Sequence, residues 1–183
     1  MQNDSVLYNE FLAGNTSSFD ELMIRYGDNL MYYLYGYVHN LEDAEDLMIE
    51  AFARIMAKKP SISEGSFKAY LFRTGRNLAA RFHLIKSRMN VFSMDSLPVE
   101  LSDHKSVETE LLNEEKKRIL HLCLERIDPE VREAIWLVYF EEMSYAAAGE
   151  VMGVKTKRID KLLTRGKKLL REELLKEGIT DAH

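Results

Sequence analysis

Residues 144–163, SYAAAGEVMGVKTKRIDKLL, contain two helical patterns separated by a glycine turn. Ser144 is suited to be the N-cap of a helix over 145–152, because its hydroxyl can accept a hydrogen bond from an amide of the first turn. A second helix is expected over 156–176. A helix-turn-helix needs a small residue where its helices touch, a glycine in the turn and a branched apolar residue in the second helix. Three residues at the expected spacings fit this pattern, namely Gly149, Gly153 and Ile159.

The second helix of this motif has two separate faces at about 100° per residue. One face is apolar and is expected to be buried: Ile159, Leu162, Leu163, Gly166, Leu169 and Leu170. The opposite face is polar and mostly cationic, and it consists of Lys157, Lys161, Thr164, Arg165 and Lys168. Cations arranged in this way can contact phosphates and base edges in the major groove of DNA. A plain amphipathic helix at a lysine-rich C-terminus is the alternative interpretation.

The rest of the chain also has the apolar spacings of helices, without strand-like alternation. We predict an all-α protein of two small helical domains joined by a linker, with helices over 4–14, 18–39, 41–57, 66–88, 106–126, 129–140, 145–152 and 156–176. The stretch from Met89 to Ser106 breaks the periodicity with Pro98 and a cluster of acidic residues. The expected organisation is therefore a first domain, an acidic linker, a second domain and a tail, at 1–90, 91–106, 107–177 and 178–183.

A second basic helix is the one predicted over residues 66–88. Its apolar residues form one stripe, at alternating spacings of four and three: Leu71, Gly75, Leu78, Phe82, Ile85 and Met89. Polar residues lie opposite this stripe or on its flank, and they are Arg73, Arg76, Asn77, Arg81 and Arg88. A Ser/Gly loop after Lys58-Lys59-Pro60 leads into Phe67 and Tyr70. Cations mixed with aromatics suit single-stranded DNA, because aromatic faces stack on unpaired bases, and core packing of the two aromatics is the alternative.

Charge is segregated along the chain, although the formal net charge is only −5. Residues 19–50 hold eight acidic residues against one arginine, and residues 95–115 hold seven against one lysine. Residues 54–88 hold nine lysines and arginines against one glutamate, and residues 155–171 hold eight against one aspartate. A single charged block is often only a solvated face. Two compact basic blocks on amphipathic helices favour a polyanionic ligand.

Composition and motif content exclude several classes of protein. The 183 residues are 46% hydrophobic and 30% charged, which excludes collagen-like and wholly disordered chains. No apolar run approaches the roughly 18 residues of a membrane span, so no membrane insertion is expected, and the polar start predicts neither a secretory signal nor a transit peptide. The single cysteine, Cys123, excludes an intrachain disulfide and indicates a reducing compartment. The histidines are scattered and form no metal-ligand spacing, so no metal site is expected. The sequence also has no nucleophile-elbow or phosphate-loop motif, so neither an enzyme activity nor a cofactor is expected.

Both halves of the chain resemble parts of the extracytoplasmic-function (ECF) sigma factors, the smallest class of bacterial RNA polymerase specificity subunits in the sigma-70 family. The first half resembles sigma region two through FDEL at 19–22, DAEDL at 43–47 and GSFKAYLFR at 65–73. The second half resembles sigma region four through MSY at 143–145, MGV at 152–154 and KKLLR at 167–171. The resemblance covers about residues 7–177, in the order and spacing of the family.

The resemblance implies a cytoplasmic initiation factor that directs core RNA polymerase to promoter DNA, with an anti-sigma factor as a further partner. Region two would recognise and melt the minus-ten element through Lys59, Ser63, Phe67, Tyr70, Arg73, Arg76, Asn77 and Arg81. Region four would recognise the minus-thirty-five element through Lys155, Thr156, Lys157, Arg158, Lys161, Arg165 and Lys168. The helix that begins at Asp43 would bind the polymerase clamp through Asp43, Asp46, Leu47, Glu50 and Phe52.

The chain departs from the family pattern within the helix-turn-helix. The usual Glu-Glu-Ile-Ala after Tyr145 is Ala146-Ala147-Ala148-Gly149 here, which removes the polar outer face of the first helix. The usual serine cap of the second helix is Lys155, so Thr156 is the expected N-cap instead. These departures bear on the promoter preference of region four more than on its fold.

Two functions from other classes remain open at this stage. One is a helix-turn-helix repressor or activator that binds duplex DNA as a dimer without polymerase. The other is a sigma-like scaffold that contacts only protein partners. Binding to isolated core polymerase distinguishes the first alternative from a sigma factor, and a promoter-dependent transcript distinguishes the second.

Overall fold

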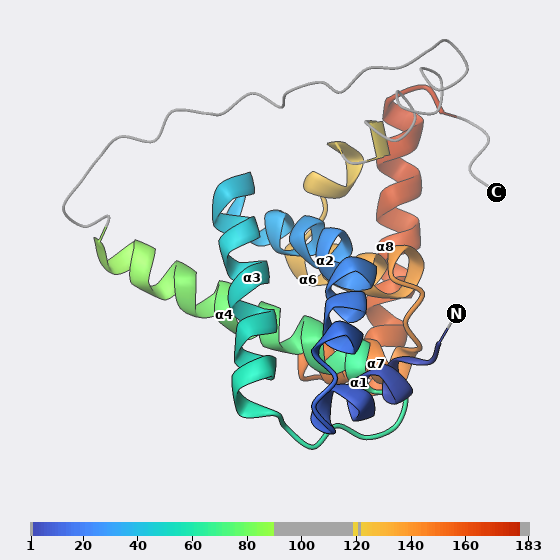
Figure 1. Ribbon diagram of the computed structural model, residues 1–183. Helices are drawn as coiled ribbons and strands as arrows, with labels where there is room; N and C mark the ends of the chain where they lie inside the picture. The colour runs from blue at the N-terminus through green and yellow to red at the C-terminus, as the bar shows by residue number, and fades with distance from the viewer. Residues whose placement is uncertain (1, 90–118, 121, 180–183) are drawn as a thin grey trace, which may run out of the picture. The chain divides into compact units, whose positions relative to one another are not determined.

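The computed structural model describes residues 2–89, 119–120 and 122–179, which form helices joined by short loops (Figure 1). The chain divides into two compact units, one built mainly from residues up to 98 and the other mainly from the residues that follow. Within the described residues there is no strand, in agreement with the predicted all-α class. The predicted linker at 91–106 and the first part of the helix predicted over 106–126 lie outside these residues.

The first unit contains α1 (Asp4–Leu12), α2 (Thr16–Val38), α3 (Leu41–Lys58) and α4 (Phe67–Met89), each within two residues of its predicted bounds. Asparagine side chains cap two of these helices. The Asn3 side chain accepts a hydrogen bond from the Ser5 amide at 3.0 Å, and Asn40 accepts one from the Asp43 amide at 2.9 Å. These caps begin α1 and α3 at the residues where the sequence predicts them.

Aromatic side chains from three helices fill the centre of the first unit. The Phe19 ring of α2 lies 4.5 Å from the Phe11 ring of α1 and 6.0 Å from the Phe52 ring of α3, measured between centroids. An ion pair ties α1 to α2, in which Arg25 Nη1 lies 2.6 Å from the Asp4 carboxylate. Tyr26 of α2 also donates a hydrogen bond to Asp4. The position of α1 is therefore fixed by both apolar packing and polar contacts.

The second unit contains helical residues at 119–120 and 122–125, then α6 (Pro129–Ile135), η2 (Trp136–Phe140), α7 (Tyr145–Met152) and α8 (Thr156–Lys176). The Asp128 carboxylate caps α6 by accepting a hydrogen bond from the Glu130 amide at 3.1 Å, and a proline at the first helical position supports this start. The single helix predicted over 129–140 in fact changes to a π-helical turn after Ile135. Buried side chains of α6, including Val131 and Ile135, pack in the same unit as α8.

The helix-turn-helix has the geometry that its sequence predicts, apart from one cap. Ser144 Oγ accepts a hydrogen bond from the Ala147 amide at 3.1 Å, which confirms it as the cap of α7. Gly153 has a φ of 68° in the turn, a conformation that favours glycine. The predicted N-cap role of Thr156 is wrong, because Lys155 occupies that position without a side-chain cap bond and Thr156 is the first residue of α8.

Gly149 of α7 lies against the backbone of the turn that follows this helix. Its replacement tests whether this close packing stabilises the helix-turn-helix. A Cβ atom at this position would lie 2.7 Å from the Val154 carbonyl oxygen, which is backbone and cannot rotate away. We expect Gly149→Ala to destabilise the second unit by about 1–3 kcal/mol, although alanine is the better helix former by about 1 kcal/mol. Urea unfolding followed by the fluorescence of the single tryptophan, Trp136, measures this effect in the second unit.

Gly36 provides the matched control for this substitution. It lies within α2, and a Cβ atom there would meet nothing within 4 Å. Gly36→Ala is therefore expected to raise stability by about 0.5–1 kcal/mol, as measured by far-ultraviolet circular dichroism. Equal effects of the two substitutions would show that close packing at Gly149 is not what holds the helix-turn-helix.

Candidate nucleic-acid interface

The exposed face of α8 is cationic, as predicted. Five polar side chains that were predicted to point away from the core are exposed, and they are Lys157, Lys161, Thr164, Arg165 and Lys168. The opposite face is buried at Ile159, Leu162, Leu163 and Gly166, and half-buried at Leu169 and Leu170. Residues of the turn and of the first two turns of α8 line a shallow, open groove: Val154, Lys155, Lys157, Arg158 and Lys161. The N-terminal half of α8 thus presents several cations around one concave surface.

Arg158 differs from its neighbours because its guanidinium is held within the protein. Its Nε and Nη2 atoms donate to the two carboxylate oxygens of Glu130 at 3.1 and 2.5 Å. This bidentate contact lowers the pKa of the Glu130 carboxyl below its ordinary value and raises that of Arg158. The contact joins the first turn of α8 to the first turn of α6. In this arrangement Arg158 orients the helix, and a direct DNA contact would require it to leave Glu130.

Along α4, the predicted DNA-facing side chains differ in exposure. Arg73, Asn77 and Arg81 are exposed and are spaced four residues apart, so they lie along one line of the helix. Arg76 and Tyr70 are half-buried. Three of the eight predicted minus-ten residues therefore form a continuous polar line, and Arg76 lies at its edge.

The apolar stripe predicted for α4 is correct for its first half and wrong at Ile85. Leu71, Gly75 and Leu78 are buried and Phe82 is half-buried, whereas Ile85 is 51% exposed. The difference arises because α4 continues past the helices that cover it, as Figure 1 shows for its C-terminal turns. Contacts of α4 with α2 and α3 near this end are polar: His83 Nε2 lies 2.7 Å from the Tyr37 carbonyl oxygen, and Lys86 Nζ lies 3.4 Å from Asp43. The side chain of Met89 lies outside what the structure describes.

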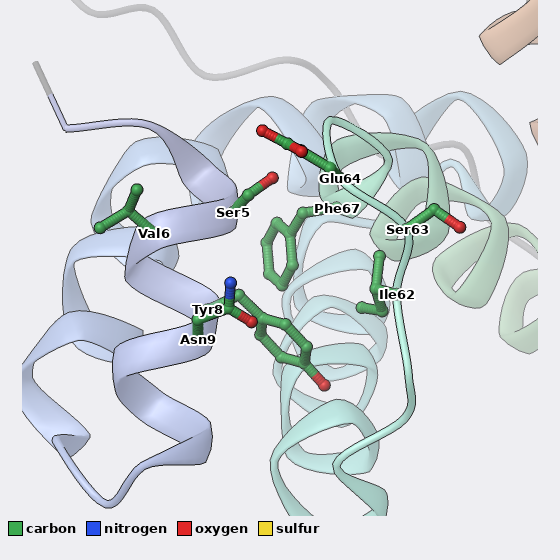
Figure 2. Close-up of a pocket in the computed structure, with 8 residues that line it drawn as sticks. All are labelled: Ser5, Val6, Tyr8, Asn9, Ile62, Ser63, Glu64 and Phe67. Carbon is green, nitrogen blue, oxygen red and sulfur yellow. The ribbon is translucent and has the colours of Figure 1, made fainter.

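The loop between α3 and α4 carries the other predicted minus-ten residues. Lys59 and Ser63 are exposed, and Lys59 has a left-handed φ of 44° at the end of α3. Phe67 is only 1% exposed and lies behind the loop (Figure 2). Core packing, the alternative left open for this residue, is therefore correct, and Phe67 cannot stack on a base without leaving the core. Tyr70 remains the aromatic residue of this pair with an accessible surface.

The acidic helix α3 presents a different set of side chains from the one predicted to bind polymerase. Asp46 and Glu50 are exposed, but Leu47 and Phe52 are 6% and 1% exposed and belong to the core. Direct contact of those two apolar side chains with another protein is therefore ruled out in this fold. Asp43 is half-buried and paired with Lys86 of α4, at 3.4 Å.

Sequence reasoning missed the apolar part of this α3 surface. Ile49 is 49% exposed and Met56 is 41% exposed, and they lie seven residues apart on the same face as Asp46 and Glu50. Apolar spacing alone gave no clear signal for them, because Ile49 lies three residues before buried Phe52 and Met56 lies four residues after it. Exposed apolar residues ringed by charge are typical of protein interfaces.

Metal-binding clusters and membrane-spanning helices are both absent from the residues that the structure describes. Among these residues, no three histidine, cysteine, aspartate or glutamate side chains gather closely enough to hold a metal ion. None of the helices over the described ranges combines the length and the apolar character needed to cross a bilayer.

Comparison with known protein families matches both halves of the chain. The "Sigma-70 region 2" family matches residues 22–88, which contain α3, α4 and most of α2, and the "Sigma-70, region 4" family matches residues 117–170, which contain the helix-turn-helix. The chain belongs to the sigma-70 family. The curated relatives place it among the ECF sigma factors, so the resemblance found in the sequence is confirmed.

Individual relatives agree with this assignment. The ECF RNA polymerase sigma factor SigE of Mycolicibacterium smegmatis is 31% identical over 168 residues, a match that covers 88% of this chain and 63% of SigE. This chain thus spans less than two thirds of that relative. The ECF RNA polymerase sigma factor SigM of Bacillus subtilis is 26% identical over 162 residues, covering 88% of this chain and 98% of SigM.

Solved structures show the same fold. CnrH, solved in complex with the cytosolic domain of CnrY, is 22% identical and superposes with a TM-score of 0.67, covering 93% of this chain and 96% of CnrH. The sigma factor RpoE of Bartonella quintana, solved in complex with the anti-sigma factor NepR, is also 22% identical, with a TM-score of 0.66 and coverage of 85% and 96%. The predicted class, two small helical domains of the sigma region two and four types, is confirmed.

Proposed function

We propose that this sigma-70 family member is a transcription initiation factor, without enzyme activity of its own, that binds core RNA polymerase and directs it to specific promoters. The observation that carries the proposal is the presence, in one chain, of both sigma regions, each with an exposed cationic helix. The domain at 1–90 would bind polymerase and the minus-ten element. The domain at 107–177 would bind the minus-thirty-five element.

Two surfaces support this division of labour. The line formed by Arg73, Asn77 and Arg81 on α4, with Tyr70 and the loop at 59–66 beside it, suits single-stranded DNA, because cations can hold the phosphates while an aromatic face stacks on a base. The groove at the start of α8 suits duplex DNA, since the N-terminal residues of a recognition helix enter the major groove.

Polymerase and an anti-sigma factor are the protein partners of this proposal. The exposed face of α3, with Ile49 and Met56 beside Asp46 and Glu50, combines the apolar and charged residues of a docking surface for the polymerase clamp. An anti-sigma partner is supported by solved relatives of this fold that were captured with CnrY and NepR. A factor that acts on polymerase and promoter DNA would work in the cytoplasm.

Titration of core RNA polymerase tests this function against the dimeric regulator. A sigma factor is expected to bind core polymerase as a single copy in the absence of DNA and to confer promoter binding on the complex. A dimeric regulator would bind duplex DNA without polymerase and would show no affinity for core polymerase. No binding to core polymerase at micromolar concentration would therefore contradict the proposal.

Substitutions along α8 test how the helix meets duplex DNA. Lys157→Ala and Lys161→Ala are expected to relax sequence preference at individual base pairs, and each base edge left without its lysine should cost about 1–3 kcal/mol. Lys168→Ala is expected to weaken binding to all sequences alike and to lower the salt slope by about one. A binding-site selection with the holoenzyme, followed by titrations at several salt concentrations, measures both effects.

Arg171→Ala is the control from the same helix. It removes an equal charge from an exposed position away from the groove at the start of α8, so sequence preference should stay as in the wild type. A changed preference in Lys168→Ala, together with wild-type preference in Lys157→Ala and Lys161→Ala, would reverse the assignment of base and phosphate contacts.

A further inference from the structure

The loop between α3 and α4 is attached at both ends to α1, a helix more than 50 residues earlier in the sequence. At its start, Tyr8 Oη donates a hydrogen bond to the Pro60 carbonyl oxygen at 2.7 Å. At its end, the Gly65 amide donates one to Ser5 Oγ at 2.9 Å. Figure 2 shows Tyr8 and Ser5 of α1 on one side of a small pocket, with Ile62, Ser63 and Glu64 of the loop on the other. Between the two attachment points, the loop carries the exposed Ser63.

The side chain that makes the first attachment is itself held in one position. Tyr8 is 3% exposed, and its ring lies 5.4 Å from the ring of Phe67, centroid to centroid. Burial raises the pKa of Tyr8 to about 12, so the hydroxyl stays protonated and remains a hydrogen-bond donor at neutral pH. The Lys59 ammonium lies 5.1 Å from the centre of the Phe11 ring, so α1 also contacts the first residue of the loop.

The position of α1 does not depend on the loop. Asp4, in its first turn, binds both Arg25 and Tyr26 of α2, and Ser18 of α2 donates a hydrogen bond to Glu10. Leu7 and Phe11 bury their side chains in the core of the first unit. A helix fixed in this way can hold a flexible segment in one conformation, because the segment gains hydrogen bonds without moving the helix.

We infer that α1 is a brace that holds the loop at 59–66 in the conformation that captures the single-stranded minus-ten element, and that Tyr8 is its main positioning residue. The inference rests on the proposed function, because it assumes that this loop binds DNA. A loop that is ordered before binding loses less conformational freedom when the strand arrives, so its affinity is higher. Tyr8 acts through Pro60 and has too little exposed surface to contact the strand itself.

Tyr8→Phe tests the brace, since it removes the hydroxyl and keeps the ring packed on Phe67. The probe is a fluorescent single-stranded oligonucleotide with the non-template minus-ten sequence of a promoter that wild-type holoenzyme selects from a random library. We expect the Kd of Tyr8→Phe holoenzyme for this strand to rise about threefold to tenfold, the effect of losing one hydrogen bond. Hydrogen exchange at the loop amides should become faster in the same variant. Affinity for core polymerase should not change.

Tyr33→Phe is the matched control. Tyr33 is also 3% exposed in the first unit, and its hydroxyl lies 3.3 Å from that of Tyr37, one turn further along α2. The Tyr33→Phe variant should lose about as much stability as Tyr8→Phe and should keep wild-type affinity for the strand. Ser5→Ala, which removes the acceptor of the Gly65 amide, is a second variant that should weaken strand binding in the same direction as Tyr8→Phe.

The outcomes separate the brace from the proposed function. If wild-type holoenzyme binds the strand and both Tyr8→Phe and Ser5→Ala bind it equally well, the brace is wrong and the function stands. If Tyr33→Phe loses as much affinity as Tyr8→Phe, the effect is one of general stability and the brace is again wrong. If wild-type holoenzyme binds the minus-ten strand no better than single strands of other sequence, the proposed function is wrong, and the inference that rests on it is wrong as well.

Discussion

Holoenzyme carrying both Arg73→Ala and Arg81→Ala is expected to bind promoters and to fail to open them. The two arginines are exposed on one line of α4, on either side of Asn77. Hydrogen bonds to charged groups contribute about 1.5 kcal/mol or more each, so the loss of two should weaken capture of the melted strand about 100-fold. Permanganate reactivity of unpaired thymines in the minus-ten element measures opening, and gel mobility measures closed complexes, which the domain at 107–177 should still support.

A variant with the same loss of charge in the second unit controls for electrostatics at long range. Arg171 and Lys176 are both exposed near the end of α8, away from the groove at its start. Arg171→Ala/Lys176→Ala should therefore open promoters nearly as well as the wild type. Wild-type permanganate reactivity in Arg73→Ala/Arg81→Ala would show that this line of α4 is not the surface that captures the melted strand.

Charge reversal on α3, in the variant Asp46→Lys/Glu50→Lys, is expected to lower affinity for core polymerase at least tenfold. Both acids are exposed and lie within one turn of Ile49, and Glu50 also pairs with Arg54 of the same helix at 2.6 Å. The buried side of the helix, with Leu47 and Phe52, is left intact. Like charges placed against each other at a complementary interface cost several kcal/mol, which is enough for a tenfold loss of affinity. Fluorescence titration of labelled protein with core polymerase measures the change.

Folding and specificity both need controls in this experiment. Far-ultraviolet circular dichroism and Tm should show that the variant is folded. Glu125→Lys/Glu172→Lys makes the same change in net charge on exposed residues of the second unit and should bind core polymerase with nearly wild-type affinity. Unchanged affinity in Asp46→Lys/Glu50→Lys would move the polymerase contact away from this face of α3.

The helices could be predicted from the sequence because local rules determine them. Asn40 and Ser144 cap helices through their own side chains, and the apolar face predicted for α8 is buried at four positions and half-buried at Leu169 and Leu170. The exposure of Ile85 could not be predicted in the same way. It depends on where the neighbouring helices end, and periodicity within α4 holds no information about that.

The candidate sites depended on contacts between residues far apart in the sequence. Periodicity shows that α3 has apolar residues at several angles around its axis, but it does not show which face the rest of the unit covers. The sequence alone therefore predicts Leu47 and Phe52 at the interface, in place of the exposed Ile49 and Met56. The pairing of Arg158 with Glu130 spans 28 residues, and the contact of Tyr8 with Pro60 spans 52. Only the folded chain reveals such contacts, because charge and aromatic patterns in sequence do not specify partners.

Run-off transcription on a randomised promoter library, with core polymerase and this protein as the only factors, tests the central claim most directly. We expect transcripts that depend on the protein, and we expect the selected templates to share two conserved elements about 35 and 10 base pairs upstream of the start site, as the two sigma regions imply. Two results would contradict the claim that this chain directs polymerase to promoters. One is an amount of transcript no greater than core polymerase makes alone, and the other is a set of transcripts whose templates share no upstream sequence.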